Sequence, residues 1–141
     1  MSYDLNVYVR KDRLPSAAAL RERLARAGRG VELRDIDDLT NIRGFVPVML
    51  DGALTGFELY SSDITDRDRD EYRELLKERG EAPDEFLKIL TTCDLDVGFS
   101  CKASDSRERV AARIVATALA EAAQGWLSDP QTDETISYAA R

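Results

Sequence analysis

The sequence predicts an α+β protein in which a mainly antiparallel sheet carries helices on one face, as a two-layer sandwich. Segments of alternating apolar and polar residues recur along the chain, and an Asp-Gly pair separates two apolar runs. Segments with helical periodicity lie between the predicted strands. The chain has 141 residues and contains no repeat, linker or low-complexity segment, which predicts a single domain over residues 1–141.

The N-terminal part predicts a strand, a helix and a second strand. Residues 4–10 alternate, with Tyr8 on the polar face of a half-buried strand. Pro15 and Ser16 open a helix over residues 17–27, which ends at two nearby glycines. The second strand is predicted from three apolar residues: Val31, Leu33 and Ile36.

A tight hairpin is the clearest local prediction. Asp51 and Gly52 lie between the apolar runs 45–50 and 53–60, and a type I′ turn needs positive φ at both central positions. Pro47 lacks an N–H, so we expect its strand either to be a sheet edge there or to have its N–H side unpaired.

The remaining elements are predicted in the order helix, helix, strand, helix, strand, strand. Thr65 or Asp66 can cap a charged helix over about 66–79, which has few apolar residues and is expected at the rim. The helices at 16–27 and 106–124 are expected to cover the sheet. A short helix is predicted from Pro83-Asp84 to Leu90, and strands are predicted at 94–101, 126–127 and 136–138. The helix at 106–124 is expected to be capped by Ser104 and Asp105, with Glu108 at capping-box spacing from Asp105. Its predicted apolar face consists of Val110, Ile114, Ala118, Leu119 and Ala122.

Composition excludes several classes of function. The chain has no histidine, which removes Ser-His-Asp and Cys-His catalysis and histidine metal sites. The net charge is −7, which disfavours binding to nucleic acid or to an anionic membrane. No signal peptide or membrane-spanning run is recognisable, so we expect a cytoplasmic protein whose two cysteines are free and buried.

Two acidic groups are candidates for a metal or catalytic site. Residues 66–71 begin like a calcium loop, but Glu71 replaces the required glycine and Lys77 the bidentate glutamate, so a solvated helix start is the better interpretation. Asp35, Asp37 and Asp38 could hold magnesium, but no phosphate-binding loop accompanies them. We therefore predict no metal, no cofactor and no enzymatic activity.

Three motifs of the chain form a recognisable set. They are the opening residues 1–9 with Pro15-Ser16, Gly44-Phe45-Val46-Pro47-Val48 followed by Gly56-Phe57-Glu58-Leu59-Tyr60, and Ala118-Leu119-Ala120-Glu121 followed by Gly125-Trp126-Leu127-Ser128-Asp129-Pro130-Gln131. Together they cover about half the chain and resemble small bacterial immunity proteins encoded beside polymorphic or secreted toxins, of the type VI or contact-dependent kind. The resemblance implies neutralisation of a toxin by binding, with no catalytic residues.

The charge pattern indicates where a cognate toxin with a basic surface would bind. Residues 63–85 carry ten acidic and five basic side chains, and acidic patches steer association with basic partners. Of the aromatic residues Phe57 and Tyr60, one should face outward if the other is buried. The predicted partner-binding residues are Glu58, Tyr60, Asp63, Asp66, Asp68, Asp70 and Glu71. The alternatives are a regulatory or adaptor domain that binds a non-toxin protein, and a histidine-free enzyme.

Overall fold

The computed structural model describes residues 1–34, 36 and 38–139. The chain begins with strand β1 and then a short 3-10 turn. In chain order the elements are β1 (Ser2–Val9), the turn at Lys11–Arg13, α1 (Ala17–Ala27), β2 (Val31–Leu33), β3 (Arg43–Leu50), β4 (Ala53–Asp63), α2 (Asp66–Glu78), α3 (Glu85–Thr92), β5 (Leu95–Lys102), α4 (Ser106–Ala123), β6 (Trp126–Asp129) and β7 (Glu134–Ser137).

The strands form one antiparallel sheet in the order β2-β3-β4-β5-β1-β6-β7, which confirms the predicted α+β class. β1 and β5 lie in the interior of the sheet and pair over their whole length. β4 continues to Asp63, three residues beyond the predicted end. β7 begins at Glu134, two residues before the predicted start.

The β3–β4 hairpin has the predicted turn. Asp51 and Gly52 both have positive φ, 50° and 80°, as a type I′ turn requires. β2 pairs with β3 over residues 48–50, and just beyond this pairing the N–H of Arg34 donates to the carbonyl of Pro47 at 3.4 Å. Pro47 has no N–H to return this bond, and the paired register of the two strands ends at Val48.

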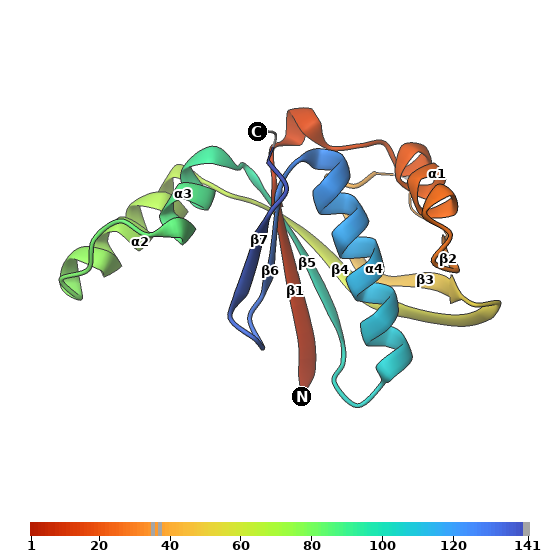
Figure 1. Ribbon diagram of the computed structural model, residues 1–141. Helices are drawn as coiled ribbons and strands as arrows, with labels where there is room; N and C mark the ends of the chain where they lie inside the picture. Colours follow the sequence, from red (N-terminus) through yellow and green to blue (C-terminus); the bar gives the residue numbers. More distant parts are fainter. Residues whose placement is uncertain (35, 37, 140–141) are drawn as a thin grey trace.

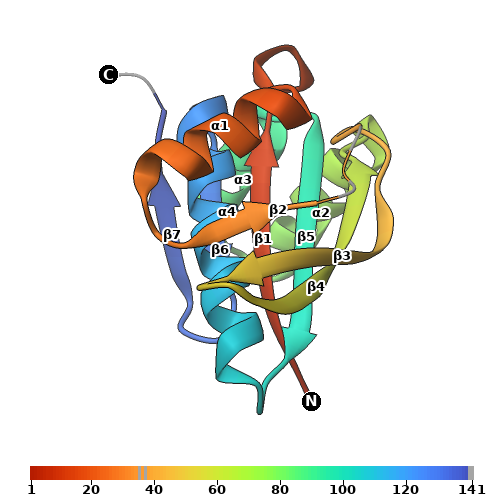
Figure 2. The ribbon, with the colours of Figure 1, turned by 90° about the vertical axis from the view of Figure 1, so that its right-hand side faces the viewer.

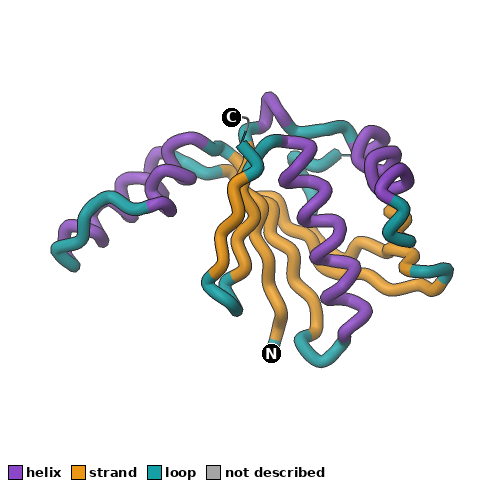
Figure 3. The backbone as a smooth tube through the Cα atoms, viewed as in Figure 1, coloured by secondary structure: helices purple, strands orange, loops and turns teal. Residues whose placement is uncertain are grey.

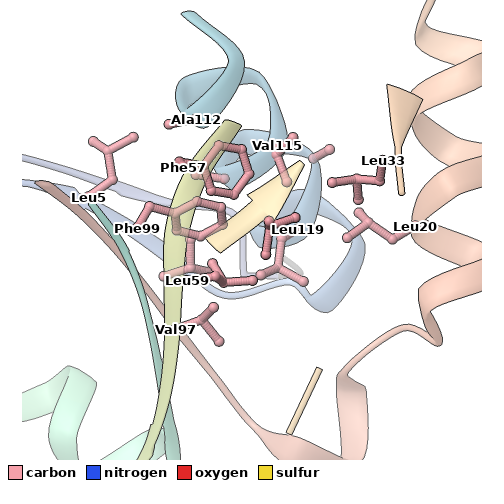
Figure 4. Packing of buried hydrophobic residues seen from close by; sticks show 14 of the residues in the cluster. Leu5, Leu20, Leu33, Phe57, Leu59, Val97, Phe99, Ala112, Val115 and Leu119 are labelled. Atoms are coloured by element: carbon pink, nitrogen blue, oxygen red, sulfur yellow. The ribbon is translucent and has the colours of Figure 1, made fainter. Parts of the chain in front are cut away.

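Helices α1 and α4 cover one face of the sheet and enclose the main core (Figure 1). The rings of Phe57 and Phe99 lie 5.2 Å apart in this core, near Val115 and Leu119 of α4 (Figure 4). The predicted apolar face of α4 was wrong at Val110, which is 47% exposed, although Ala118 and Leu119 are buried as predicted. The helix buries six alanines, whose small side chains permit close approach of its neighbours: Ala111, Ala112, Ala116, Ala118, Ala120 and Ala123.

Helices α2 and α3 lie on the opposite side of the sheet, at one end of it (Figures 1 and 2). The tube view shows them as an arm that extends away from the fan of strands (Figure 3). They enclose a second, smaller cluster of buried residues: Tyr8, Ile64, Ile89, Leu90 and Cys93. Tyr8 lies on the face opposite Leu5, Val7 and Val9, as the alternation predicts, but it is buried rather than solvated, because α3 covers that end of the face.

Side-chain caps fix the helix starts. Thr65 and Asp68 form a capping box at α2, so this acidic stretch is a helix start rather than a cation loop. Asp105 caps α4 by accepting the N–H groups of Arg107 and Glu108. The predicted capping box at Asp105 is not formed, because Glu108 accepts the backbone N–H of Lys102 at 3.3 Å.

Candidate functional site

A groove of about 540 Å³ separates the α2–α3 arm from the uncovered face of the sheet. The sheet contributes its floor and the two helices contribute one wall. It is lined by Tyr8, Ser62, Asp63, Ile64, Asp68, Glu71, Tyr72, Leu75, Phe86, Leu90 and Asp96. Four of these residues are acidic and three are aromatic, so the groove combines negative charge with flat apolar surface.

Arg69 holds α2 in the position that forms the groove. Its guanidinium donates to the backbone carbonyls of Leu90 at 2.6 Å and Cys93 at 3.1 Å, at the end of α3. Carbonyls at a helix C-terminus lack partners within the helix, so a charged donor stabilises them strongly. The sequence pattern alone did not reveal this link between the two helices.

Three aromatic rings form a continuous series from the floor to the wall. Phe86 of α3 makes edge-to-face contacts with Tyr8 at a centroid distance of 5.8 Å and with Tyr72 at 4.9 Å. The hydroxyl of Tyr72 donates to Asp84 at 2.5 Å, and this bond raises the pKa of Tyr72 to about 12. The ring of Phe86 is thus held between those of Tyr8 and Tyr72, and Tyr72 is in turn held by its hydrogen bond to Asp84.

Asp96 lies in the floor of the groove. In the sheet register it pairs with Tyr8 of β1 on one side and Ser62 of β4 on the other, so the three side chains share the uncovered face. Burial raises the pKa of Asp96, and a hydrogen bond of 2.9 Å from the Asn6 amide lowers it by less. Among the residues that the structure describes, no lysine or arginine pairs with this carboxylate.

The structure brings together three of the seven predicted partner-binding residues and separates the others. Asp63, Asp68 and Glu71 line the groove. Asp66 and Asp70 do not share this surface, because they project from the other side of α2 and pair with Arg69 at 2.8 Å and Arg73 at 3.2 Å. The single acidic face expected from these residues is therefore not formed.

Glu58 and Tyr60 lie on the uncovered face of β4, next to the groove. Tyr60 is 38% exposed and donates its hydroxyl to Glu58 at 2.7 Å, whereas Phe57 is buried in the core. This confirms that only one of the two aromatic residues faces outward, and that it is Tyr60. Tyr60 precedes Ser62 by two residues on the same side of the strand, so this exposed surface continues into the groove.

Sequence reasoning missed the other eight groove residues, among them the three aromatic residues and the half-buried acid: Tyr8, Tyr72, Phe86 and Asp96. Strand alternation correctly places Asp96 and Tyr8 opposite the main core, and this signal could have paired them across β1 and β5. The contact with Phe86 depends on how α3 docks, which no local pattern specifies.

The two cysteines are free and buried, as predicted. Burial raises the pKa of Cys93 and raises that of Cys101 to about 11. Neither thiol is therefore activated as a nucleophile at neutral pH.

The carboxylate cluster considered at residues 35–38 falls partly outside the described residues, since these do not include Asp35 and Asp37. Asp38 accepts hydrogen bonds from the backbone and hydroxyl of Thr40, which lower its pKa. Within the described part of the chain, no group of three acidic or cysteine side chains is arranged to hold a metal ion. None of the described helices is long and apolar enough to cross a membrane.

Comparison of the chain with protein-family models, curated proteins and solved structures gave no match.

Proposed function

We propose that this protein is an immunity protein, which neutralises a bacterial toxin by stoichiometric binding through the groove between the α2–α3 arm and the sheet. The observation that carries the proposal is the combination, in one concave surface, of four acidic residues with the aromatic series Tyr8, Phe86 and Tyr72. The resemblance of three sequence motifs to immunity proteins supports the same function.

The acidic residues suit a toxin with a basic surface. Asp63, Asp68 and Glu71 surround the groove, and long-range attraction between opposite charges raises the rate of encounter. Aromatic side chains at the centre of an interface contribute most to slow dissociation. The groove therefore offers both features that a tight protein inhibitor needs.

The uncovered sheet face next to the groove would extend the contact. Phe45 and Leu54 are 62% and 67% exposed, and the β3–β4 register places them on the same face as Tyr60. A stable complex buries about 800 Å² on each partner, more than a groove of this size alone provides. In the proposal the two proteins meet in the cytoplasm, where free thiols remain reduced.

Co-expression with the product of the adjacent gene tests the proposal. Growth is scored with and without this protein, and the purified mixture is separated by size-exclusion chromatography. Rescue of growth together with a stable complex is the expected result. Rescue without a complex would instead indicate an enzyme that reverses the damage, and a complex without toxicity would indicate an adaptor.

A further inference from the structure

We infer that the floor of the groove is a receptor for one arginine side chain of the partner, which pairs with Asp96 beside the rings of Tyr8 and Phe86. This inference rests on the proposed function, because it names the chemistry by which the same groove would recognise its partner.

The first argument is the state of the four groove carboxylates. Three of them already have partners: Asp63 pairs with Lys11 at 2.6 Å, Glu71 pairs with Arg67 at 2.9 Å, and Asp68 accepts the backbone N–H of Thr65 at 2.8 Å. Among the described residues, Asp96 has only one hydrogen-bond partner for its side chain, the neutral amide of Asn6, at 2.9 Å. It is also more buried than the other three, so it gains most from a cation brought by a partner.

The second argument is the position of Asp96 in the sheet. It lies on interior strand β5, with Tyr8 beside it on β1 and Ser62 on β4. Gly98, two residues along, has no side chain and leaves the face open between Tyr60 and Asn6. An incoming side chain can therefore approach Asp96 along the uncovered face, over the gap at Gly98.

The third argument selects arginine over lysine. The guanidinium is planar, stacks on aromatic rings and is less strongly hydrated than an ammonium group. The edge-to-face contact of Tyr8 with Phe86 places two rings at different angles beside Asp96, and Tyr72 continues the wall. A planar cation can make a charge-assisted hydrogen bond to the carboxylate and contact a ring at the same time.

The test uses the isolated ¹⁵N-labelled protein and needs no toxin. N-acetyl-arginine amide is titrated while backbone amide shifts are followed by NMR, with N-acetyl-citrulline amide as the neutral isostere and N-acetyl-lysine amide as the second cation. We expect saturable shifts at Tyr8, Ser62 and Asp96 with the arginine compound. Affinity for citrulline and lysine amides should be at least about fivefold weaker.

Two variants complete the test. Asp96→Asn should weaken arginine-amide binding by at least about fivefold, while Asp70→Asn, on the far side of α2, should leave it unchanged. Equal binding of citrulline amide, tighter binding of lysine amide, or shifts centred elsewhere would overturn the inference, and these results do not depend on any variant. Co-expression rescue can succeed while this titration fails, so failure of the receptor is distinguishable from failure of the proposed function.

Discussion

At the scale of single residues, Asp129 and Asp96 show two different uses of a carboxylate in this fold. Asp129 is 4% exposed, and both of its carboxylate oxygens accept hydrogen bonds, from Tyr3, Gln131 and the guanidinium of Arg113. These bonds connect β1, α4 and the β6–β7 turn, so Asp129 has a structural role. Asp96 has a single neutral donor, and its burial is therefore not compensated within the described residues.

The raised pKa of Asp96 predicts how stability changes with pH. In the unfolded state the pKa of an aspartate is about 3.9. Because the pKa of Asp96 is raised in the folded state, the folded protein binds this proton more tightly than the unfolded chain does. Its contribution to stability is full below the unfolded pKa and is lost as pH rises through the folded pKa. Urea denaturation should therefore find Asp96→Asn more stable than wild type at pH 7, with the difference vanishing near pH 3.

Asp84 provides a control of opposite sign. Burial raises the pKa of this carboxyl. Hydrogen bonds from Tyr72 and from the backbone N–H of Leu87 together lower the pKa by more than burial raises it, so the net shift is downward. Its contribution is present above the unfolded pKa and is lost as pH falls through the folded pKa. Asp84→Asn should thus be less stable than wild type at pH 7, and the same sign for both variants would contradict this account.

At the scale of elements, two glycines occupy positions with opposite tolerance for a side chain. A Cβ on Gly125, between α4 and β6, would collide with the backbone carbonyl oxygen of Tyr8. A Cβ on Gly98 in β5 would meet its nearest atoms, Nδ2 of Asn6 and the carbonyl of Tyr60, at an ordinary 3.7 Å. The close approach of α4 and β6 to β1 therefore depends on Gly125.

We expect Gly125→Ala to lower the free energy of unfolding by about 1–3 kcal/mol, because the backbone must move to remove the collision. Gly98→Ala is the matched control and should raise it by about 0.5 kcal/mol, since alanine loses less backbone entropy than glycine in a strand. Chemical denaturation of both variants measures the two effects. A stability loss at Gly98 as large as that at Gly125 would refute the packing assigned to β6.

Local patterns accounted for most elements but not for how they dock. The alternation in β1 and β5 and the Asp51-Gly52 turn were predicted because they depend on neighbouring residues alone. The rotation of α4 and the position of the α2–α3 arm were not, since they depend on contacts such as those of Arg69 with carbonyls more than twenty residues away. The separation of Asp66 and Asp70 from Glu71 has a different cause: it follows from the helical periodicity of α2, which is local and could have been applied to the predicted helix.

At the scale of the whole molecule, the fold has one covered and one largely uncovered sheet face. α1 and α4 cover one side of the sheet (Figure 1) and supply the core there. This leaves the other side free to carry the groove, Phe45 and Tyr60. The main core thus lies on one face of the sheet, and the proposed partner-binding surface lies on the opposite face. Substitutions on the uncovered face can change binding with little effect on the main core.

The central claim is that the partner binds on the groove side of α2. The most direct test measures how tightly two double variants bind the adjacent gene product. One variant combines Asp63→Lys with Glu71→Lys in the groove, and the other combines Asp66→Lys with Asp70→Lys on the far side of α2. Both variants change the net charge by the same amount. Isothermal titration at two salt concentrations, on variants with wild-type circular dichroism, gives the affinities. We predict that the groove pair weakens binding by at least about a hundredfold and the far-side pair by less than about fivefold. Equal effects of the two pairs, or the larger effect from the far side, would contradict the account.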